Sequence, residues 1–394
     1  MVFELIVKRD CLKKIFIFML VFCILFDPQV PFLPNGVGFS FLVVIILIPF
    51  VMSQKFRINN FYEFVYYKNY FIIFMILLLY IVFMICLHQS DIAFLLSWCK
   101  AFVLFCAFYF VYSLFLKDSS PSYLFKILLC AFVFNALVNI VAGTFYNTFD
   151  FLNIFHGAGI SDSLGKNYYR HSFITGSSYF SIGTAYGVFC ILFMSHIVKN
   201  NKYSVPILLL FSLVCLSGFV AARTSGIAII LSVMYLFLSK PSKFLKLLVI
   251  GMICVFVLIS LPNMSKYSNW MLSFFDLAHN GSANYVIHKM YFWPGLDIFI
   301  YGTGYSHPGA FIYSDGGYMN DILFGGIVFA IVKISFLLMF FRAFFKSNKF
   351  IITIICVSIL LFNFKGLFMY NNAQGMAIFY FTSLYFLKLR EDSR

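Results

Sequence analysis

The residues best suited to chemistry in this sequence are isolated cations in polar stretches between long apolar runs. Arg223 lies in the stretch AARTSG, where small neighbours would let backbones approach closely. Thr224, Ser225 and Gly226 would open the following helix, so amides, hydroxyls and a guanidinium could converge on an anion. We interpret this turn as a phosphate-binding site. The alternative is an arginine at a helix end whose guanidinium simply snorkels to water.

A second candidate is the pair Arg170 and His171, which precedes a Gly- and Ser-containing run. An arginine beside small residues could again bind a phosphate group. His171 would titrate near neutral pH and could transfer a proton. An ordinary hydrated loop would contain the same residue types, so both interpretations stay open.

The third candidate is the stretch IYGTGYSHPGAFIYSDGGYMNDILFGGI, which starts at Ile300. Gly302 and Gly304 predict a tight turn, and Asp315 would lie at the N-terminal end of the helix that follows. Asp315 could accept the proton of a hydroxyl group. It could equally be an ordinary helix-capping aspartate, and the sequence alone leaves the two nearly balanced.

The composition decides which elements must position these residues. Of the 394 residues, 62% are hydrophobic and 11% are charged, whereas soluble domains are about half apolar and about a quarter charged. Apolar runs close to the roughly 20 residues that cross a bilayer recur along the whole chain. They lack the alternation of barrel strands. The sequence therefore predicts an all-α integral membrane protein, with residues 1–394 forming a single polytopic membrane domain.

We predict about twelve transmembrane helices and two large loops. The helices are expected at 15–33, 37–54, 70–87, 92–116, 123–146, 178–198, 204–222, 226–239, 244–262, 317–341, 350–367 and 373–388. The large loops are 147–177 and 263–316, and every other connection is short. Because loops of this length are usually functional or disordered, we expect the chemistry on the side of the membrane where both lie.

The distribution of lysine and arginine predicts the orientation. Of the 28 basic residues, 20 fall on one side of the predicted helices and 6 on the other, while Lys100 and Lys333 fall inside helices. Cytoplasmic loops retain basic residues, so both termini should be cytoplasmic and both large loops external. The basic residues lie singly or in pairs at helix ends, so the net charge of +14 does not indicate nucleic-acid binding.

Cysteine and histidine give no sign of a cofactor. The ten cysteines fall in predicted helices or in the N-terminal segment, so disulfides are not expected. The seven histidines are scattered, and neither HExxH nor CxxC occurs. We expect chemistry without a metal or other cofactor.

The layout and the three local patterns resemble the bacterial O-antigen polymerases and, more distantly, the O-antigen ligases. That family commonly has a small-Ser-Arg-Thr type turn, similar to AARTSG at 221–226, and an arginine in the first large loop, matched by Arg170. It also commonly has a Gly-x-Gly turn before a loop that feeds a helix, similar to SDGGYMNDILFGGI. Many relatives place a histidine where this chain has Asp315. They also place an arginine several residues before a tryptophan, where this chain has Lys289 before Trp293.

The resemblance implies a metal-independent glycosyltransferase of GT-C-like architecture that functions in lipopolysaccharide biosynthesis. It would transfer the growing glycan from undecaprenyl diphosphate to the non-reducing end of an incoming lipid-linked repeat unit, at the periplasmic face of the inner membrane. Its partners would be these lipid-linked units, membrane lipids and a chain-length regulator. The diphosphate would be bound by Arg223, Arg170 and Lys289. The candidate bases are Asp315, His171 and His307. Sugar rings would contact Tyr305, Tyr313, Trp293 and Tyr318.

Three alternatives come from other classes. A polysaccharide flippase would have a similar helix count, but transporters usually place ionisable residues within their helices. We expect all fourteen acidic residues outside the helix centres, and Lys333 close enough to the cytoplasmic end to snorkel. An O-antigen ligase would differ in its acceptor, lipid A core. A purely structural membrane protein would leave the outer arginines without a role.

The predicted topology can be tested by cysteine labelling. Cysteines introduced at Ser163 and Ser282, one in each large loop, should react with a membrane-impermeant thiol reagent added outside the cell. Labelling only from the cytoplasmic side would contradict the topology.

Overall fold

The chain is helical over the residues that the computed structural model describes. These residues are 2–31, 33, 37–53, 65–90, 92–145, 148–156, 169, 172–176, 179–262, 264, 289–305, 314, 316–342, 348–368 and 372–392. Their one departure from helices and loops is an antiparallel bridge between Gln29 and Gly38. The predicted all-α membrane class is confirmed at this level.

The long helices of the described residues follow the predicted ranges. They are α1 (Val2–Phe26), α2 (Phe39–Ser53), α4 (Val65–His88), α5 (Ala93–Val111), α6 (Pro121–Thr144), α9 (Tyr179–Asn200), α10 (Val205–Ala221), α11 (Ser225–Ser239), α12 (Pro241–Ile259), α16 (Gly317–Arg342), α17 (Lys349–Lys365) and α18 (Ala373–Glu391). Short helical segments are η1 (Tyr112–Leu116), η3 (Asp150–Phe155) and α15 (Leu296–Tyr301). Apart from the first, the predicted and observed ends agree within about five residues. Continuous apolar runs therefore locate helices well in this chain.

Six stretches of the described residues are long and apolar enough to cross a membrane. They are Phe71–His88, Phe94–Leu116, Pro121–Thr144, Tyr179–Asn200, Pro241–Ile259 and Gly317–Ser335. Shorter apolar helices cover Phe39–Ser53, Val205–Ala221 and Ser225–Ser239. The count of twelve membrane crossings stays a prediction.

The first helix was predicted wrongly at 15–33, because α1 ends at Phe26. Asp27 has φ +38°, in the left-handed region, and Pro28 follows, which disfavours a continuing helix. The buried Asp27 carboxylate instead accepts a hydrogen bond from the Ser40 amide at 3.0 Å and so binds the first turn of α2. Its other oxygen lies 3.1 Å from Lys100 Nζ in α5. Asp27 thus ends α1 and binds residues of both α2 and α5.

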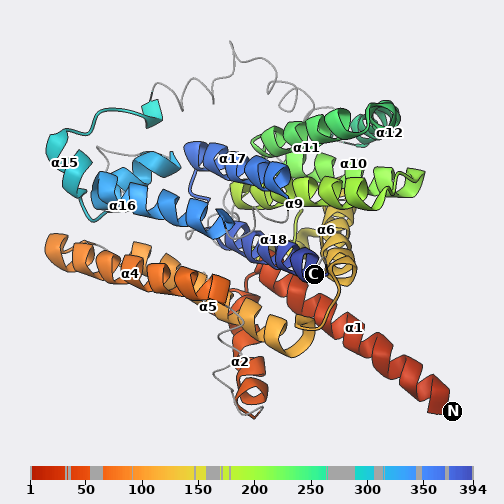
Figure 1. Cartoon of the computed structure of the whole chain (residues 1–394), viewed down its shortest axis with the longest axis horizontal. Helices are drawn as coiled ribbons and strands as arrows, with labels where there is room; N and C mark the ends of the chain where they lie inside the picture. Colours follow the sequence, from red (N-terminus) through yellow and green to blue (C-terminus); the bar gives the residue numbers. More distant parts are fainter. Residues whose placement is uncertain are drawn as a thin grey trace.

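The centre of the molecule is α9, which packs against α10, α11, α17 and α18 (Figure 1). Gly183 and Gly187 lie one turn apart on α9 and permit this packing. A Cβ at Gly183 would lie 2.4 Å from the Ala222 Cβ, and one at Gly187 would lie 3.1 Å from the Ala228 Cβ. Small residues at such positions let transmembrane helices approach closely. The helices α10 and α11 are therefore fixed against α9 through its glycine face.

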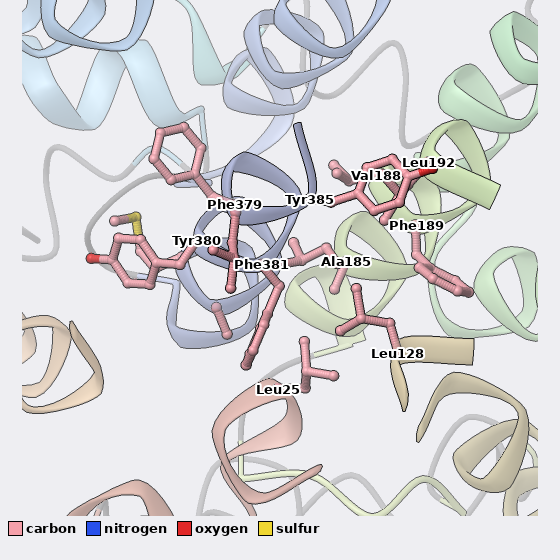
Figure 2. Close-up of a cluster of buried hydrophobic side chains, with 14 of the residues drawn as sticks. Leu25, Leu128, Ala185, Val188, Phe189, Leu192, Phe379, Tyr380, Phe381 and Tyr385 are labelled. Atoms are coloured by element: carbon pink, nitrogen blue, oxygen red, sulfur yellow. The ribbon is translucent and has the colours of Figure 1, made fainter. Parts of the chain in front are cut away.

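Aromatic side chains fill the opposite side of α9. Figure 2 shows Phe189 of α9 and Phe379, Tyr380, Phe381 and Tyr385 of α18 in one buried cluster with side chains from α1 and α6. In the same core, Phe189 stacks on Phe132 of α6 with ring centroids 4.2 Å apart. This cluster joins the N-terminal, central and C-terminal parts of the chain.

Helix α16 is interrupted at Gly326, where φ is +72° and ψ is −178°. The interruption leaves backbone carbonyls without helical partners, which is costly inside a membrane. The segment after α15 satisfies two of them: the Thr303 amide donates to the Leu323 carbonyl at 2.7 Å, and the Gly304 amide to the Phe324 carbonyl at 2.9 Å. Tyr80 of α4 donates its hydroxyl proton to the Gly325 carbonyl at 2.8 Å.

Glycine is required at Gly302 and at Gly326, where the segment after α15 contacts the break in α16. A Cβ at Gly302 would lie 2.4 Å from the Phe324 carbonyl oxygen, and a Cβ at Gly326 would lie 2.0 Å from the Ile300 carbonyl oxygen. Both residues also have positive φ. Gly304 has positive φ as well, so both glycines of the predicted Gly-x-Gly turn adopt backbone conformations that favour glycine, and this segment lies against the break in α16.

A buried ion pair bridges the break. Lys333 Nζ lies 2.6 Å from Asp321 Oδ1, and the side chains are 2% and 0% exposed. On a straight helix, residues twelve positions apart are separated by about 18 Å along the axis, beyond the combined reach of these side chains. The contact therefore requires the two halves of α16 to bend toward each other at Gly326.

One expectation about charge was wrong here. Lys333 was expected to snorkel to the membrane surface, but it is buried and pairs with Asp321, near the start of α16. The reason is that the bend brings together two residues whose spacing would separate them on a continuous helix.

The ion pair makes a stability prediction. Asp321→Leu should lower the free energy of unfolding by about 3–5 kcal/mol, because it leaves the Lys333 charge buried without its partner. The double variant Asp321→Leu/Lys333→Met should lose less, because no lone charge remains. Denaturation of the purified protein in detergent would measure both. The pairing would be contradicted if the double variant lost as much free energy of unfolding as the Asp321→Leu and Lys333→Met single variants lose together.

Candidate functional site

The ten residues predicted to bind or react divide into two halves. Five lie outside the described residues: Arg170, His171, His307, Tyr313 and Asp315. The other five are described: Arg223, Lys289, Trp293, Tyr305 and Tyr318. The site is therefore built from these five and from the described neighbours of the rest.

The AARTSG turn between α10 and α11 differs from the predicted anion site in two respects. The amides of Ser225, Gly226 and Ile227 donate to the carbonyls three residues before them, at 3.0, 2.9 and 3.2 Å. They are therefore already used in the turn. The small residues do not clear space around Arg223 either, because Ala222 packs against Gly183 of α9. Close helix packing explains the small residues.

One side chain of this turn remains suited to an anion, that of the partly exposed Arg223. The hydroxyl oxygen of Thr224 is buried and has no hydrogen-bond partner among the described residues. The Ser225 hydroxyl is buried as well and faces Gly218 of α10. An anion at this turn would therefore contact the Arg223 guanidinium, with no cradle of free amides.

The residue before Arg170 is fixed close to this turn. Tyr169 is 2% exposed and belongs to one apolar cluster with Val220, Leu258 and Met264. Its hydroxyl donates to the Pro262 carbonyl at 2.6 Å, beyond the end of α12, and burial raises the pKa of Tyr169, which keeps the hydroxyl protonated at neutral pH. Val220 lies three residues before Arg223 in the chain. The segments that carry the two predicted phosphate-binding arginines therefore meet at one end of the helices.

The residues after His171 are fixed as well. Asn135 of α6 accepts a hydrogen bond from the Ile174 amide at 3.0 Å and donates to the Ile174 carbonyl at 3.3 Å. Gln374 of α18 donates to the Thr175 hydroxyl at 2.9 Å and to the Phe26 carbonyl at 2.8 Å. The loop is thus bound to α1, α6 and α18 directly beyond His171.

His156 is a further anchor that the sequence interpretation missed. It is 5% exposed, and its Nε2 donates to the Phe173 carbonyl at 2.7 Å. Its Nδ1 has no hydrogen-bond partner among the described residues, which fits a neutral ring. Burial lowers the pKa of His156, and the hydrogen bond to Phe173 only partly opposes this effect.

A second group of predicted residues lies where the segment 289–305 meets α16 and α17. The Ser314 hydroxyl donates to the Met290 carbonyl at 2.7 Å, and Gly316 packs against the Tyr291 ring. Met290 and Tyr291, which follow Lys289 in the chain, thus contact both described neighbours of Asp315. Lys289 itself is exposed.

The predicted sugar-binding aromatics have different environments. Trp293 is 67% exposed and lies 5.0 Å from the Phe299 ring. Tyr305 is partly exposed. Tyr318 is also partly exposed, but its hydroxyl donates to the Leu360 carbonyl at 2.7 Å and joins α16 to α17. A sugar face could stack on Trp293, and exposed tryptophans are also common anchors at membrane interfaces.

The described contacts connect the two groups through α9 and α17. Phe180 in the first turn of α9 contacts Gly366 at the end of α17, and Gly317 at the start of α16 contacts the carbonyls of Asn363 and Gly366.

An apolar groove of about 500 Å³ lies below the Arg223 turn, between α10, α11 and α12. Its lining includes Leu216, Ile229, Gly251 and Phe256. Because Leu216 and Ile229 are six or seven residues from Arg223, the groove begins about 10 Å along the helices from the guanidinium-bearing turn. The groove has the shape and chemistry to hold a hydrocarbon chain.

Comparison of the chain with protein-family models, with curated proteins and with solved structures found no match.

The lowered pKa of His156 predicts a pH-dependent stability. In the unfolded chain the ring should titrate near its ordinary value of 6.5, whereas the folded protein keeps it neutral to lower pH. The stabilisation is thus complete above about pH 6.5 and is lost as the pH falls below that value. Thermal unfolding between pH 7.5 and 5 should show this loss, and His156→Gln should reduce its slope. A variant with the wild-type slope would contradict the prediction.

Proposed function

We propose that this protein is an O-antigen polymerase, a metal-independent glycosyltransferase of the bacterial inner membrane with both termini in the cytoplasm and its active site at the periplasmic face. The observation that supports this most is the cluster of Tyr169 with Val220. It joins the chain segment before Arg170 to the one before Arg223, as a diphosphate site built from both arginines requires.

The donor would be a glycan on undecaprenyl diphosphate. Arg223 and Arg170 would bind the diphosphate oxygens. The apolar groove below the turn would take part of the hydrocarbon chain. Charge that develops on the leaving diphosphate is stabilised best by cations already in place, and a guanidinium can bind two oxygens at once.

The acceptor would enter from the side of Lys289 and Trp293. Its hydroxyl oxygen would attack the anomeric carbon of the donor sugar, and the bond from that carbon to the diphosphate oxygen would break. The hydroxyl proton would pass to Asp315, His171 or His307. Lys289 would be a third cation for the diphosphate. Trp293 and Tyr305 would offer faces to the sugars, and Tyr318 would offer only its ring, since its hydroxyl is used by Leu360.

A second candidate function is transport of the lipid-linked saccharide across the membrane. The Asp321–Lys333 pair across the break in α16 favours it, because buried ionisable residues and interrupted helices are common in transporters. The pair removes the main argument that the sequence offered against a flippase. The two functions predict different amounts of O-antigen on the lipopolysaccharide when the protein is missing.

Deletion of the gene, followed by complementation, tests the proposal. The deletion should leave lipopolysaccharide capped with a single repeat unit, since ligation would continue without polymerisation. Arg223→Ala should fail to restore chain extension at normal membrane levels of the protein. Arg223→Lys should give shorter chains, because lysine keeps the charge but not the paired donors. Gel electrophoresis of lipopolysaccharide measures the chain length in the deletion strain and with each of the two variants.

Other outcomes would identify the alternatives. Complete loss of O-antigen from the core after deletion would point to a flippase or a ligase. Wild-type chain lengths with Arg223→Lys would contradict the bidentate role, and wild-type lengths with Arg223→Ala would leave Arg223 as a snorkelling residue.

A further inference from the structure

A polar pocket of about 440 Å³ lies where α1, η1 and α6 meet. It is at the other end of α6 from Tyr169, because α6 begins at Pro121 beside the pocket and ends at Thr144, whose hydroxyl lies 3.2 Å from the Tyr169 hydroxyl. The pocket therefore lies on the side of the membrane predicted to be cytoplasmic, far from the proposed reaction site.

Basic side chains predominate among the charged groups that line this pocket. Lys13 and Lys14 come from α1 and Lys117 from the end of η1, while Asp118 is the one acidic residue among the lining residues. Three lysines from two distant parts of the sequence thus line the pocket together with one aspartate. The net positive charge suits a ligand with a phosphate group.

The local structure holds the wall formed by Lys117 in place. The π-helical turn η1 ends α5, and the Ser119 hydroxyl donates to the Leu116 carbonyl at 2.7 Å. The Lys388 ammonium of α18 donates to the Lys117 carbonyl. Ser120 caps α6 by accepting a hydrogen bond from the Tyr123 amide at 3.2 Å, so the positive end of the α6 dipole also points to the pocket.

The surface beside the pocket is apolar. On α1, Ile15, Phe16 and Met19 follow the two lysines and are 54%, 44% and 50% exposed. These positions share one helical face, and in Figure 1 the N-terminal part of α1 extends away from the other helices. A ligand with a phosphate in the pocket could lay hydrocarbon chains along this face, which a free phosphate could not use.

We propose that this pocket binds the headgroup phosphate of an anionic phospholipid, with its acyl chains against α1. The lysines supply the charge, the pocket supplies the shape, and the exposed apolar face selects a lipid over a soluble phosphate. Basic pockets between transmembrane helices at the cytoplasmic surface have the chemistry for such headgroups. The site is independent of the proposed glycosyl transfer.

The test uses the full-length protein purified in detergent and phosphatidylglycerol as the probe, with retained lipid counted by native mass spectrometry. Replacing Lys13, Lys14 and Lys117 together with glutamine should weaken binding on the order of 100-fold, at roughly fivefold for each lysine. The control replaces Lys199, Lys202 and Lys240, which are exposed residues outside the pocket with the same total charge. It should change binding by less than about twofold, because these charges lie outside the pocket. Arginine at the three pocket positions should retain the lipid.

Binding measurements with two other ligands distinguish the possible occupants of the pocket. Phosphatidylcholine should bind much more weakly, and inorganic phosphate at the same concentration should not displace phosphatidylglycerol. Equal losses in the pocket and control variants would overturn the proposal in favour of general surface charge. Equal binding of both phospholipids would overturn it too, as would displacement by phosphate, which would indicate a soluble ligand. If the glutamine variant is misfolded, loss of lipid from the folded arginine variant would also overturn it.

Discussion

The Asp321–Lys333 ion pair is the interaction on which the arrangement of α16 and the segment after α15 depends. Two charges inside a membrane protein are costly unless they are paired closely, and this pair is 2.6 Å apart and almost fully buried. Its geometry exists only because α16 bends at Gly326. The bend in turn frees carbonyls at Leu323 and Phe324, and the segment after α15 occupies them. One pair of charges is therefore coupled to the placement of a loop that carries candidate ligand-binding residues.

The other end of the proposed site depends on close packing, with no ion pair described there. Gly183 and Gly187 bring α10 and α11 against α9, and this places the Arg223 turn at the end of the bundle. Tyr169 then fixes the first large loop to the same end through its cluster and its hydrogen bond to Pro262. Since α9 also contacts the end of α17 through Phe180, one helix relates the arginine turn to the start of α16. A substrate that touches both groups would span this junction.

The sequence predicts the helices well because each needs only a local property, a continuous apolar run. It fails at α1, where the side chain of Asp27 has a better use in capping α2 than in extending a helix. The Asp321–Lys333 pair could not be predicted from helical spacing, since it depends on a bend. The adjacent Gly325 and Gly326 were the available sign of that bend.

In the candidate site, too, some features could be predicted from the sequence and others depend on the fold. The small residues around Arg223 have two uses in principle, and only the structure shows that packing against α9 is the one they serve. Asn135 and Asn139, one turn apart in an apolar run, were a readable sign that α6 binds a polar partner on one face. That partner is the backbone of the first large loop, through Ile174 and Tyr169, and only the fold could identify it.

The central claim is that the protein transfers a glycan from a lipid diphosphate. The most direct test is to reconstitute the purified protein in vesicles with an undecaprenyl-diphosphate-linked repeat unit and to measure released undecaprenyl diphosphate together with glycan length. The account predicts that one undecaprenyl diphosphate is released for each glycosidic bond formed, with no added metal required. Movement of the lipid-linked unit across the vesicle membrane, without release or chain extension, would contradict it and would establish the transporter instead.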